Sequence, residues 1–129
     1  MESFRQDARL GKQARGRLLI AFAGALLLTS VHCGDSVGTE GLVVGGPCTT
    51  VDDCASGSVC LTSGDFPGGS CSVRCFSHED CPSGTRCVDK DKGVCLVECY
   101  EPIDCRGGYT CKGKKNESGG GESLVCIED

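Results

Sequence analysis

Cysteines are the residues of this sequence that are most able to carry out chemistry. Thirteen of 129 residues are cysteines, which is several times ordinary usage. Cysteine forms disulfides, binds metals or carries out thiol redox reactions, and spacing discriminates among these roles. Twelve of the thirteen form three groups of four: Cys48, Cys54, Cys60 and Cys71; Cys75, Cys81, Cys87 and Cys95; Cys99, Cys105, Cys111 and Cys126. Each group begins C-x5-C-x5-C, and C-x3-C joins one group to the next.

This spacing favours disulfides over metal binding or redox catalysis. Zinc sites favour C-x2-C pairs with histidines nearby, whereas the closest cysteines here are C-x3-C pairs and His78 is the one histidine after residue 33. The C-x-x-C motif of thioredoxin-like sites does not occur in the sequence. We expect no metal or other cofactor. Each group allows three pairings, of which equal spacing favours first with third and second with fourth.

Other residues offer little that could carry out catalysis. Ser77, His78 and Glu79 are adjacent along the chain, whereas a hydrolytic triad needs side chains that converge in a pocket. His78 is therefore predicted to be a solvated loop residue. The sequence DKDKG at 89–93 matches part of a calcium-binding loop but lacks its distant glutamate, which favours an exposed turn. We expect a protein without enzymatic activity.

Composition indicates a fold held by covalent cross-links. The chain has twenty Gly, four Phe, two Tyr and no Trp, so few large apolar side chains can build a core. A disulfide that closes a loop of about 12 residues contributes about 3 kcal/mol in the chain-entropy model. The net charge is −5, and residues 1–33 hold five of the 13 basic residues, so the remainder is strongly acidic. Such a charge disfavours nucleic acid and anionic lipid surfaces as partners.

The three groups are copies of one pattern. An acid before each second cysteine and a glycine three residues after it recur as Asp53, Asp80 and Asp104 and as Gly57, Gly84 and Gly108. The glycines predict turns with positive φ, and the aspartates predict acceptors for nearby turn N–H groups. Short extended segments such as 58–61 and 93–99 predict β-hairpins. Length varies only between the third and fourth cysteines, which predicts exposed loops at 61–70, 88–94 and 112–125.

Residues 1–32 predict a secretory signal peptide. Basic residues precede an uncharged run from Leu18 to Ser30, which at about 1.5 Å per residue is too short to cross a bilayer core of about 30 Å. The sequence SVHCGDS that follows resembles the lipobox of bacterial lipoproteins. That resemblance implies that Cys33, the cysteine outside the three groups, is diacylated and becomes the new N-terminus. Ordinary signal peptidase cleavage after Gly38, giving a secreted protein, is the alternative.

The cysteine pattern also resembles a known family. CTTVDDCASGSVC, CFSHEDCPSGTRC and CYEPIDCRGGYTC are similar to the Dickkopf-type N-terminal cysteine-rich module, over residues 48 to 126 loosely. That family is secreted and regulates receptor signalling in animals, so the resemblance implies a disulfide module. Similar repeats occur in bacterial secreted lipoproteins, in keeping with the lipobox-like leader.

These features predict a small disulfide-rich fold with a signal helix at 1–32 and a flexible tether at 33–47. Three tandem four-cysteine units with short β-hairpins and loops would follow at 48–74, 75–98 and 99–129. We expect a non-enzymatic exported lipoprotein with a structural or binding role at the cell surface. A lipid anchor would hold it to the membrane, and the three loops would contact an extracellular protein or glycan. The alternative is a secreted protease inhibitor or signalling modulator, with LTSGDFPGGS at 61–70 as its inhibitory loop.

Overall fold

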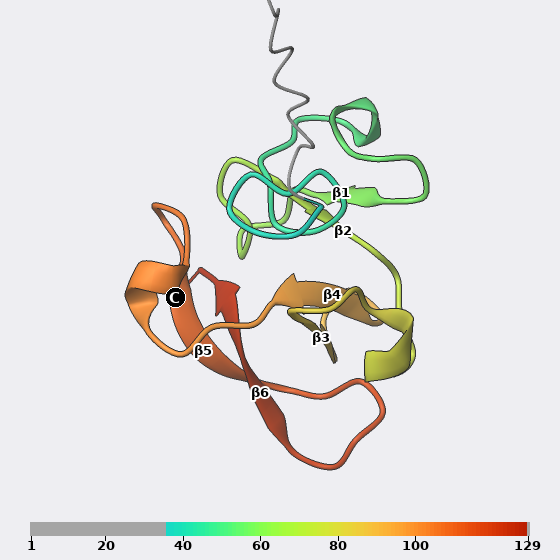
Figure 1. Cartoon of the computed structure of the whole chain (residues 1–129), viewed down its shortest axis with the longest axis vertical. Helices are drawn as coiled ribbons and strands as arrows, with labels where there is room; N and C mark the ends of the chain where they lie inside the picture. Colours follow the sequence, from blue (N-terminus) through green and yellow to red (C-terminus); the bar gives the residue numbers. More distant parts are fainter. Residues whose placement is uncertain (1–35, 129) are drawn as a thin grey trace, which may run out of the picture. The chain divides into compact units, whose positions relative to one another are not determined.

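The computed structural model describes residues 36–128, so the predicted signal peptide and the predicted acylation site at Cys33 lie outside the described residues. Three short 3₁₀ helices alternate with three antiparallel hairpins (Figure 1). In chain order these are η1 (Val51–Asp53), β1 (Val59–Leu61), β2 (Ser70–Ser72), η2 (His78–Asp80), β3 (Thr85–Val88), β4 (Val94–Val97), η3 (Pro102–Asp104), β5 (Thr110–Lys115) and β6 (Glu122–Ile127). The predicted fold class, small and disulfide-rich with short β-hairpins, is confirmed. No helix within residues 36–128 combines the length and apolar character needed to cross a membrane.

Two disulfides in each unit, six in all, tie the 3₁₀ helix to the hairpin that follows it. The first cysteine of each unit pairs with the third and the second with the fourth: Cys48–Cys60, Cys54–Cys71, Cys75–Cys87, Cys81–Cys95, Cys99–Cys111 and Cys105–Cys126. The third and fourth cysteines lie opposite each other on paired strands, as Cys60 and Cys71 do. Each of them nevertheless bonds to a cysteine that flanks the 3₁₀ helix. Both strands of every hairpin are thus fixed to the helix, and the pairing that equal spacing favours is confirmed.

The repeated aspartates and glycines have the local roles that their positions predict. Gly57, Gly84 and Gly108 have φ of 88°, 82° and 85°. The Oδ2 atom of Asp53 accepts hydrogen bonds from the N–H groups of Thr49 and Thr50, at 2.7 and 2.9 Å. Asp80 and Asp104 accept the equivalent pairs in their own units. The bonds run back to residues three and four positions earlier, so each aspartate closes the turn that opens its 3₁₀ helix.

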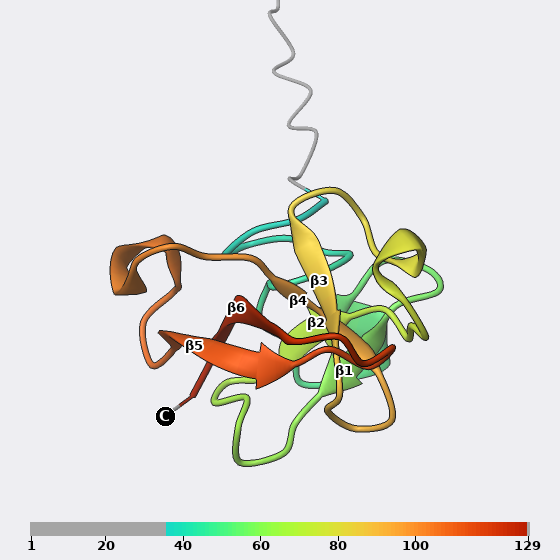
Figure 2. The ribbon, with the colours of Figure 1, turned by 90° about the horizontal axis from the view of Figure 1, so that it is seen from below.

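The three units share one small apolar core. It contains Leu61 and Phe66 from the first unit, Val88, Val94 and Leu96 from the second, and Val125 and Ile127 from the third. No unit has enough large apolar side chains to bury them by itself, so the hairpins gather around the same cluster (Figure 2). Disulfides therefore hold each unit internally, and apolar contacts join the units to one another.

Residues 36–47 are packed against the units. Val44 is fully buried among Cys75, Cys87 and Cys95. The backbone of this segment also exchanges two hydrogen bonds of 2.8 Å with Cys71, from the N–H of Gly45 and to the carbonyl of Gly46. The prediction of a flexible tether is therefore wrong for residues 36–47.

The glycines of this segment serve close packing. A Cβ at Gly45 would lie 2.3 Å from the carbonyl oxygen of Gly38, and one at Gly46 would lie 2.7 Å from that of Gly41. Only glycine allows the backbone to approach itself so closely. Glycine-rich segments are usually flexible, but in this segment the glycines allow a compact loop.

Candidate functional site

The first of the three predicted loops, residues 61–70, has an exposed tip at 62–64 and a second half that packs inward around Phe66. Phe66 is 1 % exposed and is among the largest side chains of the core. Asp65 anchors the loop from two sides, because its carboxylate forms an ion pair with Lys90 and its carbonyl accepts the N–H of Glu128 at 3.0 Å. The prediction of an exposed loop is wrong for Phe66, Gly69 and Ser70, because burying Phe66 draws the backbone toward the other two units. It is confirmed for the tip at 62–64, which is exposed.

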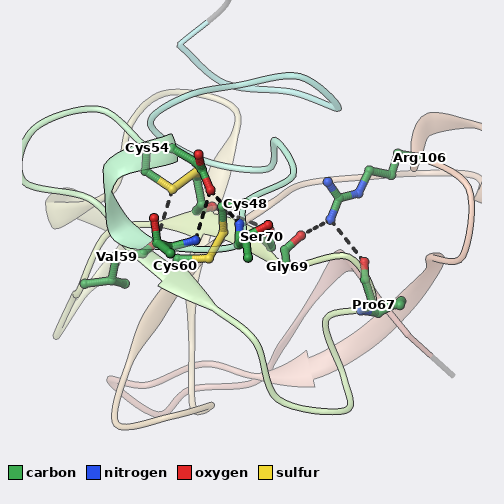
Figure 3. The surroundings of a disulfide bond; sticks show 12 residues. Cys48, Cys54, Val59, Cys60, Pro67, Gly69, Ser70 and Arg106 are labelled. Carbon is green, nitrogen blue, oxygen red and sulfur yellow. Dashed lines mark hydrogen bonds between the residues drawn. A yellow bond between two sulfur atoms is a disulfide. The ribbon is translucent and has the colours of Figure 1, made fainter.

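The third unit clamps this loop from outside (Figure 3). The Nη2 group of Arg106 donates to the carbonyl oxygens of Gly69 and Pro67, beside the Cys48–Cys60 disulfide. The hydroxyl of Tyr109 donates to the same two oxygens at 3.2 and 3.1 Å, and the guanidinium of Arg106 lies 4.5 Å from the Tyr109 ring centre. Burial raises the pKa of Tyr109, partly offset by Arg106, so the phenol stays protonated as a donor.

A small cleft adjoins this clamp. Its lining includes Arg106, Tyr109, Thr39 and Ser70, and it holds about 20 Å³ of space for a water-sized molecule. That volume fits about one water. The Nη1 group of Arg106 is buried there without a hydrogen-bond partner among the described residues. The cleft is too small to admit an organic ligand, so the clamp has a structural role.

The second predicted loop, residues 88–94, has buried ends and an exposed tip. Val88 and Val94 are fully buried, whereas Asp89, Asp91 and Lys92 are exposed. Asp91 and Lys92 both have positive φ, at 46° and 69°, so the tip is a tight turn. The exposed turn predicted at DKDKG is confirmed, and only its tip is available for contact with a partner.

The third predicted loop, residues 112–125, forms most of the longest hairpin. Strands β5 and β6 continue to Lys115 and Glu122, and the tip between them is largely exposed. The hairpin rests on the second unit, since the N–H of Asp89 donates to the carbonyl of Lys115 at 2.7 Å and that of Glu117 donates to the carbonyl of Cys87 at 3.3 Å. Of the three predicted loops, this one presents the most side chains to solvent.

An open hollow of about 390 Å³ lies where this hairpin meets the second unit. We call it the hairpin hollow; its lining is Asp89, Lys115, Asn116, Glu117, Gly119, Gly120, Gly121 and Glu122. Both signs of charge and one amide face it. The Oε2 atom of Glu117 is buried and has no hydrogen-bond partner among residues 36–128. A ligand with hydroxyl, amide or ammonium donors would match the carboxylates of the lining, which belong to Asp89, Glu117 and Glu122.

His78 has a structural contact. Its side chain is partly buried, and its Nδ1 atom accepts the N–H of Cys87 at 3.1 Å, which joins η2 to β3. The prediction of a solvated loop histidine is therefore wrong. The Ser77 hydroxyl donates to the Glu79 carboxylate at 2.6 Å and thereby lowers the pKa of Glu79. Ser77, His78 and Glu79 do not line up as nucleophile, base and orienting acid.

The cysteine sulfurs lie close together within each unit. Three of them, such as those of Cys48, Cys54 and Cys71, lie within 4.8 Å of one another in every unit. All twelve sulfurs of the three units belong to disulfides. Six disulfides in so small a fold indicate an oxidising, extracytoplasmic environment.

Exposed apolar side chains that the sequence pattern did not single out lie on the 3₁₀ helix η3 or just before η2 and η3. Phe76 and Tyr100, each directly after the first cysteine of its unit, are 83 % and 78 % exposed, and Ile103 on η3 is 84 % exposed. The signal that could have identified them is their place beside the repeated aspartates, since Phe76 and Tyr100 donate their N–H groups to Asp80 and Asp104, which are themselves exposed.

No family model, curated protein or solved structure matches this chain. The resemblance to the Dickkopf-type module therefore stays a prediction.

Proposed function

We propose that this protein is a non-enzymatic exported lipoprotein that binds an extracellular protein or glycan at the hairpin hollow. Acylated Cys33 anchors it to the membrane, and the three disulfide-linked units form a rigid support. The third hairpin presents the binding residues. The observation that carries the binding role is an open hollow of about 390 Å³ whose lining offers three carboxylates, at Asp89, Glu117 and Glu122, and the ammonium group of Lys115.

The leader and the disulfides support export. A basic segment, an uncharged run of signal-peptide length and a cysteine in a lipobox-like sequence precede the folded units. Twelve paired cysteines require an oxidising compartment to form and persist. Cys33 is the one cysteine outside these pairs, and acylation accounts for it without leaving an exposed thiol in a secreted protein.

The hairpin hollow suits a polar ligand. Its volume is in the range of sites that hold small molecules or single sugar units, about 300–1,000 Å³. Its lining offers acceptors at Asp89, Glu117 and Glu122, and a donor at Lys115. Hydroxyl-rich glycans and polar protein loops both match that combination of acceptors and donor.

The packing of loop 61–70 counts against the protease-inhibitor alternative. An inhibitory loop has to be presented to the active site of its enzyme, whereas Phe66 points into the core and Gly69 is held by Arg106. The exposed part of this loop is limited to residues 62–64 and 68, which is little surface to offer an enzyme. We therefore favour the binding role over inhibition.

Intact mass of the exported protein tests the anchor. The mature protein is expected to begin at Cys33, to carry acyl chains, and to gain twelve hydrogens on reduction, two for each disulfide. A Cys33→Ala variant is expected to leave the membrane fraction. A product that begins after Gly38 without acyl groups would establish secretion instead.

A glycan array and a panel of extracellular proteins test the binding role with the mature oxidised protein. A ligand of the hairpin hollow is expected to bind the Glu117→Ala variant at least several-fold more weakly, because its donor loses one carboxylate of the lining. Glu79→Ala is the matched control, since this exposed carboxylate lies on η2 away from the hollow. A ligand that binds both variants equally well occupies another surface and contradicts the proposed site.

A further inference from the structure

The backbone is tied into the fold from Ser36 onward. The carbonyl of Ser36 accepts the N–H groups of Val43 and Val44 at 3.0 and 3.1 Å, and the N–H of Gly38 donates to the carbonyl of Val44 at 3.0 Å. Leu42 in turn accepts the N–H of Ala55 through its carbonyl at 2.8 Å, which fastens the segment to the first unit. Residues 36–44 therefore form a closed loop, which we call the N-terminal loop.

Very little chain remains between this loop and the proposed lipid. Ser36 is three residues after Cys33. An extended chain spans at most about 3.6 Å per residue, so about 11 Å is the greatest distance that three residues can cover. The headgroup layer on each side of a bilayer is itself about 5–8 Å thick. Acyl chains on Cys33 would hold Ser36 at, or just above, the headgroups.

We infer that the folded module lies directly on the lipid surface, with the N-terminal loop facing the headgroups. This inference rests on the proposed acylation of Cys33. Leu42 is 48 % exposed on this loop, and the half-buried Val43 is next to it. Exposed Glu40 on the same loop carries negative charge and would be repelled by anionic lipid, so the partner is a zwitterionic lipid surface.

This arrangement points the hairpin hollow away from the membrane. The N-terminal loop and the tip of the β5–β6 hairpin lie at opposite ends of the described module, as Figure 1 shows. A lipid surface at one end leaves the other end accessible to a ligand. Because the anchor is covalent, a weak contact of Leu42 with headgroups suffices to orient the module.

Single tryptophans can measure this contact, because the chain contains no Trp. Leu42→Trp places the fluorophore on the N-terminal loop. Leu124→Trp is the matched control, since Leu124 on β6 is also 48 % exposed. The acylated full-length mature proteins are reconstituted into phosphatidylcholine vesicles that contain a lipid with a spin-labelled headgroup. We expect several-fold stronger quenching for Leu42→Trp than for Leu124→Trp. Equal quenching would overturn the inference.

An insertion tests whether the short reach causes the contact. About 20 residues of Gly and Ser, inserted between Asp35 and Ser36, give an end-to-end distance of about 25 Å. Quenching of Leu42→Trp is expected to fall to the level of Leu124→Trp, and undiminished quenching would overturn the inference. Intact mass separates the two proposals. Protein without acyl chains refutes the lipid anchor itself, whereas acylated protein with equal quenching at both positions refutes only the orientation.

Discussion

Loops 61–70 and 112–125 occupy the same position in the cysteine pattern but differ in how they pack against the core. Both connect the third cysteine of a unit to the fourth. The first loop buries Phe66 and is held by Asp65 and Arg106, whereas the last extends as a hairpin with an exposed tip. Length variation marks both as places where the pattern tolerates insertion. Loop 61–70 contains a large apolar side chain, which favours burial. The tip of loop 112–125 contains Lys, Asn, Glu and Gly, which favour exposure.

The contrast separates two sources of stability. Disulfides act within a unit and restrict the unfolded chain, and they are arranged alike in all three units. The shared core acts between units and depends on a few residues that each unit contributes differently. A variant can therefore weaken one source while leaving the other intact, and the two loops are the places to compare them.

Truncation of Phe66 is expected to have the largest effect. Phe66→Ala removes a fully buried ring from the shared core, and such changes cost about 3–5 kcal/mol. Leu124→Ala on β6 is the control from the third loop, and its half-exposed side chain should cost less than about 1 kcal/mol. Denaturant unfolding of the oxidised proteins measures both. Equal costs would mean that loop 61–70 is no more buried than the hairpin.

Removal of one disulfide is expected to cost about 3 kcal/mol by chain entropy. Cys54–Cys71 and Cys105–Cys126 have sequence separations of 17 and 21, so the entropic losses are nearly the same. Cys71 is fully buried, however, whereas Cys126 is partly exposed. Replacing both cysteines of a pair by alanine should therefore destabilise the first unit more than the third, as thermal unfolding would report. The reverse order would contradict a larger contribution from the more deeply buried disulfide.

Gly69 and Gly119 have similar backbone conformations, so replacing each by alanine isolates the effect of steric clash on stability. Gly69 and Gly119 have φ of 73° and 77°, so alanine is strained to a similar degree in both. A Cβ at Gly69 would lie 1.8 Å from the carbonyl oxygen of Cys48, whereas one at Gly119 meets no atom within 4 Å. Gly119→Ala should cost about 1 kcal/mol and Gly69→Ala about 1–3 kcal/mol more. Similar losses in denaturant unfolding would show that loop 61–70 can move aside.

Features that recur in all three units could be predicted from the sequence. The disulfide pairing, the positive φ of Gly57 and the hydrogen bonds to Asp53 depend on residues close together in the chain, and three copies make them recognisable. The burial of Phe66 and the clamp by Arg106 join different units and occur once, so no repeated pattern marks them.

The candidate site was predictable only in part. The sequence predicts that loop 112–125 is exposed, and its tip at 118–122 is exposed in the structure. The lining of the hairpin hollow also includes Asp89 from the second unit. The hairpin is held there by the hydrogen bond from Glu117 to Cys87, which is again a contact between units. Likewise, the glycines around Val44 could not be told from those of a flexible linker, because composition is the same in both cases.

The smallest effect is expected from acid, and it should not distinguish the units. Backbone N–H groups lower the pKa of Asp53, Asp80 and Asp104, with Thr50, Phe76 and Tyr100 as the strongest donors. A carboxylate with a lowered pKa stabilises the fold fully above its unfolded pKa of about 3.9. That stabilisation is lost as the pH falls through the lower, folded value.

Stability of the oxidised protein should therefore decline below about pH 4, and each Asp→Asn variant should flatten the decline by a similar small amount. Urea unfolding between neutral pH and about pH 2 measures this decline. The three aspartates are exposed and make equivalent bonds, so the size of the effect is set by the local turn and not by the unit that contains it. A much larger change for Asp53→Asn than for Asp104→Asn would show that the turns are coupled to the shared core, and the division between local and inter-unit stability would then fail.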